Sequence, residues 1–360
     1  MTLTVGDVVE RLAARTHPDR AAAWDAVGLQ VGDPAAPLRT VAVVHEVTEE
    51  VTRRVEGEPV DLIVSYHPLL FRPASRLVAD RSPAGRATRL LRAGVSVLVT
   101  HSDFDAMPGG MSDTMAEALG LTDVIGFSPV EPAEQIKVVT WAPDEAIIGL
   151  VEALGDAGAG RIGEYERCSF TMAGTGRFTA GPNTSPAVGQ AGAANEAAES
   201  RIEMVAPRRR LDAIVAALVA AHPYEEAPFD VFPVLANLPA GGRIGTFAGS
   251  WADLVDAVNA QFRPEGLRLA AVDGMAPRRV AVSPGAGDSR IAPAAALGCD
   301  VLVSGDISHH RMVEANDRGL SIIDAGHAAT ERPGIQRLHN LVGELVATDE
   351  ATIIPNLGRL

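Results

Sequence analysis

The sequence predicts an α/β protein built from two flanking portions, with a smaller α+β domain inserted between them. At both ends of the chain, short apolar runs rich in β-branched residues alternate with longer segments of helical period, which is typical of a mainly parallel sheet covered by helices. The middle instead contains twice as many strand-like segments as helical ones. The 360 residues also exceed the size of one average domain.

The first portion, residues 1–133, contains three strongly apolar runs at 40–47, 61–66 and 95–100. Each is short and β-branched, so each predicts a buried strand. Between the last two, residues 82–94 (SPAGRATRLLRAG) begin with Ser-Pro, place apolar residues at helical spacing and stop at a glycine. These are the start and stop signals of a helix.

The middle portion, residues 134–234, has a different order of elements. Helical patterns are predicted at 144–158 and 208–222, and strands at 134–143, 166–174, 200–207 and 227–234. The resulting order, β-α-β-β-α-β, is the ferredoxin-like plan. Between the two middle strands, residues 181–200 are rich in Gly, Ala, Ser and Pro, so a long hairpin loop or a flap is expected there.

The last portion, residues 235–360, returns to the α/β pattern. A serine at 250 precedes a helical run to residue 262, and strands are predicted at 243–249, 278–283, 299–305 and 320–324. The two ends of the chain are therefore expected to form one α/β unit.

Composition and charge exclude several classes of partner. A net charge of −15 disfavours bulk nucleic acid, which is bound mainly through Lys and Arg, and the run Arg208–Arg210 is more simply a solvated face. No apolar stretch reaches the roughly 18 residues of a membrane span.

The two cysteines, Cys168 and Cys299, are too few for a disulfide framework, which indicates a reducing, cytoplasmic location. Cys168 is expected to be a buried structural residue in a strand.

Polar residues directly follow the most apolar strands: Tyr66 and His67, the segment 101–105, the segment 304–306, and His327. The carboxyl ends of strands in α/β sheets open onto one ligand crevice, so these groups are expected to meet, although a lone histidine would more simply be a satisfied loop or core residue. Imidazole together with carboxylate suits zinc, manganese or iron(II). The predicted ligands of a divalent metal ion are His67, Asp105, His327 and Glu331, the last two lying four residues apart on one helix face.

Seven long motifs also resemble a known family. WDAVGLQVGDP (24–34), DLIVSYHPLLFRP (61–73), THSDFDAMPGGMSDTMAEALGL (100–121), VSGDISHH (303–310) and IIDAGHAATERP (322–333) are similar to the Nif-three-like family, often called GTP cyclohydrolase 1 type 2 homologs. GAGRIGEYERCSF (158–170) and AHPYEEAPFDVFP (221–233) resemble the PII/CutA-like insert of that family's longer bacterial members. The resemblance implies a core of residues 1–133 and 235–360 around a two-metal site, with an inserted domain at 134–234 and a toroidal homohexamer.

The sequence departs from the family pattern at one position that the resemblance assigns to the metals. The family usually has His-His-Pro where this chain has Tyr66-His67-Pro68. A phenol has a pKa near 10 and is a poor neutral-pH ligand for zinc, so one of two sites is expected to be weaker or empty. His45 could compensate for the lost imidazole, but a histidine that merely ends a strand is the favoured alternative.

Further residues are candidates for roles beside the metals. His101 resembles a histidine next to the metals in the family and could act catalytically by moving a proton or polarising water; the alternative is a purely structural hydrogen bond. Asp306 could hold a ligand in place. For His309 and His310 a capping or surface role is favoured over the site. Residues 24–32 and 283–289 are expected to form loops that wall the site.

Two functions of different classes follow from these expectations. The first is a metal-dependent hydrolase with one or two divalent ions per chain (zinc, manganese or iron), acting on a nucleotide or phosphorylated small molecule. The family name points to GTP only by analogy. The second is a non-catalytic metal-handling or ligand-sensing oligomeric scaffold, which the PII-like insert and Tyr66 favour.

Overall fold

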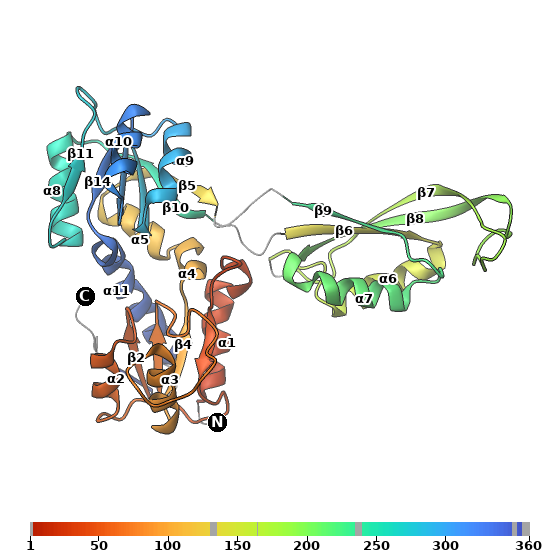
Figure 1. Cartoon of the computed structure of the whole chain (residues 1–360), viewed down its shortest axis with the longest axis horizontal. Coiled ribbons are helices and arrows are strands. Elements are labelled where there is room, and N and C mark those ends of the chain that lie inside the picture. The colour runs from red at the N-terminus through yellow and green to blue at the C-terminus, as the bar shows by residue number, and fades with distance from the viewer. Residues whose placement is uncertain (1–2, 130–134, 164, 235–239, 348–350, 355–360) are drawn as a thin grey trace. The chain divides into compact units, whose positions relative to one another are not determined.

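The computed structural model describes residues 3–129, 135–163, 165–234, 240–347 and 351–354. The chain divides into two compact units, one formed by Met1–Glu131 with Leu238–Leu360 and the other by Pro132–Asn237 (Figure 1). Its architecture is mixed α/β, with two sheets in the first unit and one in the second. Within the described ranges no helix has the length and apolarity needed to cross a membrane.

The first sheet of the first unit has the strand order β1-β4-β3-β2-β15. Its strands are β1 (Gly28–Val31), β4 (Ser96–Val99), β3 (Leu62–Ser65), β2 (Thr40–Val44) and β15 (Thr352–Ile354). The last four run parallel, and β1 is antiparallel to β4. Every residue of β3 and β4 is buried, because helices cover both faces, and this explains why these strands are uniformly apolar in sequence.

Three helices accompany this sheet: α1 (Val5–Thr16), α2 (Glu49–Val55) and α3 (Pro83–Arg92). The helix expected at 82–94 is α3, and it begins as its sequence indicates: the Ser82 side chain accepts a hydrogen bond from the Gly85 N–H, with Pro83 in the first turn. The polar residues that follow β2, β3 and β4 are thereby left at the carboxyl edge of a parallel sheet.

The second sheet has the order β11-β14-β13-β12-β10-β5. Its strands are β11 (Arg268–Ala270), β14 (Ser321–Asp324), β13 (Val301–Gly305), β12 (Arg279–Ala286), β10 (Ala240–Thr246) and β5 (Thr122–Pro129). Only β12, β13 and β14 are parallel, so this sheet is mixed and not mainly parallel as expected. Strand β5 precedes the second unit and β10 follows it, and the two pair antiparallel, so the inserted unit occupies the position of a hairpin loop.

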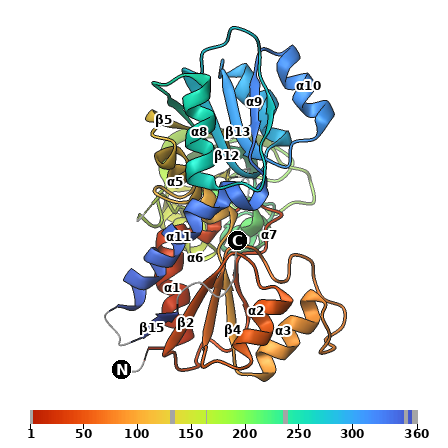
Figure 2. The ribbon, with the colours of Figure 1, turned by 90° about the vertical axis from the view of Figure 1, so that its left-hand side faces the viewer.

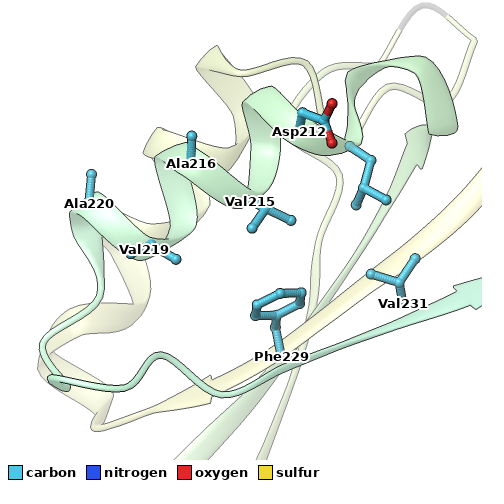
Figure 3. Close-up of a pocket in the computed structure, with 8 residues that line it drawn as sticks. Asp212, Val215, Ala216, Val219, Ala220, Phe229 and Val231 are labelled. Atoms are coloured by element: carbon cyan, nitrogen blue, oxygen red, sulfur yellow. The ribbon is translucent and has the colours of Figure 1, made fainter.

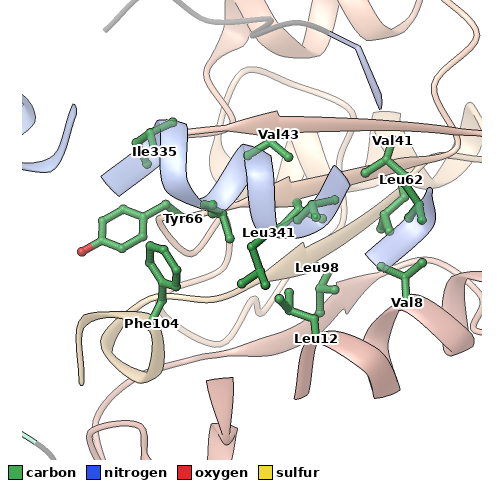
Figure 4. Close-up of a cluster of buried hydrophobic side chains, with 14 of the residues drawn as sticks. Val8, Leu12, Val41, Val43, Leu62, Tyr66, Leu98, Phe104, Ile335 and Leu341 are labelled. Carbon is green, nitrogen blue, oxygen red and sulfur yellow. The ribbon is translucent and has the colours of Figure 1, made fainter. Parts of the chain in front are cut away.

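A long helix, α11 (His327–Val346), belongs to both halves of the first unit (Figure 2). Its later turns contribute Ile335, Leu338 and Leu341 to the core of the first sheet, where Figure 4 shows Ile335 and Leu341 beside Val43 and Tyr66. Its first turns lie against the second sheet, in whose core Ala329 is buried. Helix α5 (Met111–Ala118) packs closely on α11: a Cβ at Gly334 would lie 2.0 Å from Sδ of Met111. The first turn of α11 is therefore held between the two sheets.

The second unit is one antiparallel sheet of order β7-β8-β6-β9. Its strands are β6 (Gln135–Ala142), β7 (Phe170–Thr179), β8 (Ala194–Pro207) and β9 (Phe229–Pro233), with helices α6 (Ile147–Asp156) and α7 (Leu211–Ala221). The chain order is β-α-β-β-α-β. Because β8 starts at Ala194, the loop after β7 is shorter than expected. Cys168 lies ahead of β7 and is partly exposed, so the expectation of a buried strand cysteine is wrong.

An apolar hollow of about 620 Å³ lies between α7 and β9 of this unit (Figure 3). Its wall carries Val215, Val219 and Phe229, and its one charged group is Asp212. A hollow with a single carboxylate offers little to reaction chemistry. Among the described residues, the cluster of metal-ligating side chains lies instead in the first unit.

Candidate metal centre

The carboxylate of Glu331 is the hub of a histidine cluster. Its Oε2 lies 2.6 Å from Nε2 of His45 and 3.2 Å from Nε2 of His67, and its Oε1 lies 3.2 Å from Nε2 of His327. The Glu331 side chain is only 2% exposed, while the three imidazoles are between 14% and 37% exposed. Three ring nitrogens therefore converge on one buried carboxylate from the solvent side.

The fold explains this convergence. His45 immediately follows β2 and His67 lies two residues after β3, so neighbouring parallel strands deliver them to the same edge. The His67 N–H donates a 2.9 Å hydrogen bond to the His45 carbonyl, which keeps the two loops side by side. His327 and Glu331 come from the first turns of α11 and face the same direction because they are four residues apart.

The charges of the cluster are strongly coupled. Burial would raise the pKa of Glu331, but hydrogen bonds from His327, His45 and His67 hold that pKa well below its usual range, so the group is a carboxylate. The hydrogen bond to Glu331, with the nearby Asp306, raises the pKa of His327 to about 9. Oδ2 of Asp306 lies 2.8 Å from Nδ1 of His327, which orients the ring so that Nε2 faces Glu331.

The donor atoms of His45, His67 and Glu331 all lie within 4.8 Å of one another, so these residues could hold a metal ion. The chemistry of the set fits a divalent ion of the zinc, manganese or iron(II) kind, because it combines imidazole nitrogens with one ionised carboxylate. The arrangement of the side chains also fits a bound ion. Three imidazole nitrogens surround the two oxygens of one carboxylate, so two of the imidazoles, His45 and His67, share Oε2. His327 adds a fourth donor on the opposite oxygen.

Asp105, the remaining predicted ligand, has a different partner. It lies in the short helix α4 (Ser102–Ala106), and its Oδ1 accepts a 2.5 Å hydrogen bond from the phenol of Tyr66. Burial, reinforced by the charge of Glu331, raises the pKa of Asp105 to about 7. Burial and the charge of Asp105 raise the pKa of Tyr66 well above its usual value, so the phenol keeps its proton. The structure thus brings His67, His327 and Glu331 together and engages Asp105 with Tyr66.

His101 stands beside the cluster and is fixed by Asp25. Its ring centroid lies 5.1 Å from that of His67 and 5.0 Å from that of Tyr66. Nδ1 donates to Asp25 at 2.9 Å, and Asp25 is fully buried and also accepts from the N–H and the hydroxyl of Ser102. Although burial opposes it, this hydrogen bond and the charge of Asp105 raise the pKa of His101. With Nδ1 engaged, Nε2 is the nitrogen left for proton transfer.

The segments 24–32 and 283–289 contribute backbone or side chains around the cluster. Gly285 has φ +63, and a Cβ there would come within 2.8 Å of Oε1 of Glu331, so only glycine fits this approach. Asp25 lies in the segment 24–32. No apolar strand precedes this residue, so the sequence did not predict that its carboxylate would take part in the site. His309 and His310 are exposed at the start of α10 (His309–Asp317), as the surface alternative expects.

The fold and this cluster define a mixed α/β protein with a candidate metal centre at the junction of two sheets. A family model described as Duf34/NIF3 (NGG1p interacting factor 3) matches residues 3–355, and the chain belongs to this family. A Mycobacterium tuberculosis protein named GTP cyclohydrolase 1 type 2 homolog is 36% identical over 342 residues, covering 92% of this chain and 89% of the relative.

Two further comparisons agree with this family. A Bacillus subtilis protein of the same name is 33% identical over 321 residues, covering 87% of this chain and 86% of the relative. The crystal structure of a Bacillus cereus protein related to NIF3 superposes with a TM-score of 0.63 at 29% identity, over 98% of this chain and 96% of the other. The family resemblance expected from the motifs is confirmed.

Proposed function

We propose that the chain is a metal-dependent hydrolase acting on a nucleotide or a phosphorylated small molecule. The observation that carries this proposal is the convergence of three imidazoles on the buried carboxylate of Glu331, beside a histidine that Asp25 orients. Such a pairing of a donor set with a fixed imidazole is what hydrolysis at neutral pH requires.

His45, His67, His327 and Glu331 would hold one ion, and Asp105 with Tyr66 would border a second position, giving one or two ions per chain. Zinc, manganese or iron would suit these donors. When bound, such an ion lowers the pKa of water towards 7 and polarises a phosphoryl or carbonyl oxygen.

The residues around the donors have separate tasks in this proposal. Asp25 fixes the tautomer of His101, so that Nε2 can accept a proton from the attacking water and return it to the leaving group. Asp306 performs the equivalent orientation for His327. Glu331 keeps its negative charge despite burial, which favours a cation between the imidazoles.

We further propose that residues 134–234 form an inserted PII/CutA-like domain, and that the protein is cytoplasmic and assembles as a homohexamer. The observed β-α-β-β-α-β order of the second unit supports the first point. Light scattering at micromolar concentration should give a mass several times the 37.6 kDa of one chain. A stable monomer would contradict the oligomer.

The hydrolase is tested by measuring metal content per chain in protein purified without a metal-affinity tag, followed by a panel of nucleotide and phosphate esters with the metal found. Glu331→Gln and His327→Ala should lose most of the bound metal and the turnover together, because the first removes the negative charge of the site and the second removes a nitrogen donor. His309→Ala, at an exposed histidine, is the matched control and should change neither.

The second candidate is a non-catalytic metal-handling or ligand-sensing scaffold. The Tyr66 to Asp105 hydrogen bond favours it, because it engages a carboxylate that would otherwise be available to an ion. Metal binding without turnover of any ester in the panel would favour the scaffold and count against the hydrolase.

A further inference from the structure

We propose that Trp24 and Phe71 form a stacking platform for a planar heteroaromatic ring, such as a nucleobase, carried by the ligand of the candidate metal centre. This inference rests on the proposed function, because it narrows the substrate class of that same site. The two side chains are called the aromatic platform below.

The aromatic platform is exposed and contiguous with the histidine cluster. Trp24 is 63% exposed and Phe71 is 50% exposed, and their ring centroids lie 6.0 Å apart at an angle of 59°. The Trp24 ring lies 6.1 Å from the ring of His101, which lies 5.1 Å from that of His67. Only the side chains of His101 and His67 would therefore separate a ring stacked on Trp24 from Glu331.

The backbone beneath the aromatic platform is fixed on both sides by Gln30. Its Nε2 donates to the carbonyl of Ala26 at 2.6 Å, and its Oε1 accepts from the N–H of Leu70 at 2.7 Å. These partners lie two residues from Trp24 and one residue from Phe71. One amide side chain thus ties together the two loops that carry the rings.

A second anchor holds the Trp24 loop from the inside. The Ala22 N–H donates to the hydroxyl of Ser102 at 2.9 Å, and Asp25 binds both Ser102 and His101. The residue that presents the outer ring is therefore next to the residue that orients the proposed proton carrier. The platform is preorganised relative to His101, which limits the entropy lost when a ligand stacks on it.

The chemistry of the platform selects the class of ligand. Two adjacent exposed aromatic rings beside a polar centre leave their apolar faces in contact with water. Rings that are held rigidly in this way are typical of ligand-binding sites. The rings carry no hydrogen-bonding group for a base edge apart from the indole N–H, so they would recognise a π-face and not one particular base. Phosphate or carboxylate groups of the same ligand would face the histidines.

The test uses the full-length, metal-loaded protein with two probes, guanosine 5′-monophosphate and ribose 5-phosphate, which differ by the planar ring. Replacing Trp141 and Trp251 by Phe leaves Trp24 as the only one of the 3 tryptophans, so its fluorescence reports the platform directly. We expect guanosine 5′-monophosphate to bind and quench Trp24, and to bind roughly tenfold more tightly than ribose 5-phosphate, as base stacking on an aromatic ring implies.

Variants separate stacking from other effects. Binding is measured by calorimetry, and Trp24→Ala should weaken guanosine 5′-monophosphate roughly tenfold while leaving ribose 5-phosphate and metal content unchanged. Trp24→Phe should keep most of the affinity, because it retains a π-face. Phe170→Ala is the matched control at an equally exposed aromatic residue, 63% exposed, in the second unit, and should have no effect.

Three results would overturn the platform: no binding of guanosine 5′-monophosphate at millimolar concentration, equal affinity for the two probes, or unchanged affinity in Trp24→Ala. A change of molecular mass in Trp24→Ala would also overturn it, since the rings would then belong to an interface between copies. If Trp24-dependent binding is found but no ester is hydrolysed, the platform stands and the hydrolase fails.

Discussion

The phenol of Tyr66 donates a 2.5 Å hydrogen bond to Oδ1 of Asp105, and beside the histidine cluster Tyr66 is buried and Asp105 partly buried. In Figure 4, Tyr66 lies at one end of the core of the first sheet with its hydroxyl directed away from the apolar side chains. The Tyr66 ring packs in the hydrophobic core, and its hydroxyl group contacts Asp105 at the candidate metal centre. A change at this residue therefore acts on both stability and metal affinity, and the two effects are separable by the choice of substitution.

Tyr66→Phe should lower the free energy of unfolding by about 1–3 kcal/mol, because it leaves the partly buried Asp105 without its hydrogen-bond donor. Urea unfolding of the metal-free protein measures this. Tyr165→Phe is the control, since Tyr165 is 75% exposed, and should be neutral. Equal stability of the Tyr66 variant would mean that water replaces the phenol as the partner of Asp105.

Tyr66→His should raise metal content towards two ions per chain, because a neutral imidazole can bind zinc or manganese at pH 7 without first losing a proton. Elemental analysis of the purified variant and of the wild type measures this. If the wild type already holds two tightly bound ions and the variant adds none, the tyrosine does not weaken a site.

His45→Ala should weaken metal affinity by at least about tenfold, because its Nε2 is the donor nearest to Glu331 and even residues that only orient ligands contribute about 10–100-fold. Competition with a chromogenic chelator measures the affinity. His310→Ala, at an exposed histidine, is the control. An unchanged affinity in His45→Ala would return this residue to the role of a histidine that merely ends a strand.

Deleting residues 134–234 and joining the ends should leave a folded, metal-binding core, since β5 and β10 flank the insertion and already pair as an antiparallel ladder. Circular dichroism and metal content of the shortened chain measure this. Loss of metal together with loss of a cooperative transition would show that the core depends on the insert.

Acid should destabilise the second unit partly through His222. Burial lowers the pKa of this histidine below its usual value of 6.5, against the opposing hydrogen bond to the Trp141 carbonyl. Above pH 6.5 both folded and unfolded states hold it neutral, so its contribution is fully present; as pH falls further, the unfolded chain binds the proton first and stability declines.

His222→Gln removes that titration. The full-length variant should therefore lose less stability than the wild type between about pH 7.5 and pH 5. Thermal unfolding at the two pH values measures the difference. Parallel losses in the two proteins would mean that His222 binds its proton as readily in the folded protein as in the unfolded chain.

The parts of this fold that the sequence predicts are those in which local pattern and burial agree. The largely apolar runs at β2, β3, β4, β12, β13 and β14 were all expected, and Ser82 and Ser250 cap the helices that they precede. Strands such as β1 and β11 were not expected. They are short and at most partly buried. Pairing with a neighbouring strand, more than the pattern of their own residues, therefore determines that they are strands.

The candidate site shows the same division. The positions of His67, His327 and Glu331 follow from strand ends and helical spacing. The contact of His45 with Glu331 does not, because it depends on the placement of α11 over β2, which tertiary packing decides. Asp25 was hidden for a related reason: its partner His101 is 76 residues away in the chain.

The position of α11 in the chain has a consequence for biosynthesis. Glu331 is separated from His45 by 286 residues, so a ribosome adding about 5–20 residues per second delivers the carboxylate some 14–57 s after the first histidine. Until then the nascent first sheet presents His45 and His67 without their charged partner. A metal site that needs Glu331 can form only after nearly all of the core has been translated. Metal binding would therefore follow synthesis of the core and could not assist the early steps of its folding.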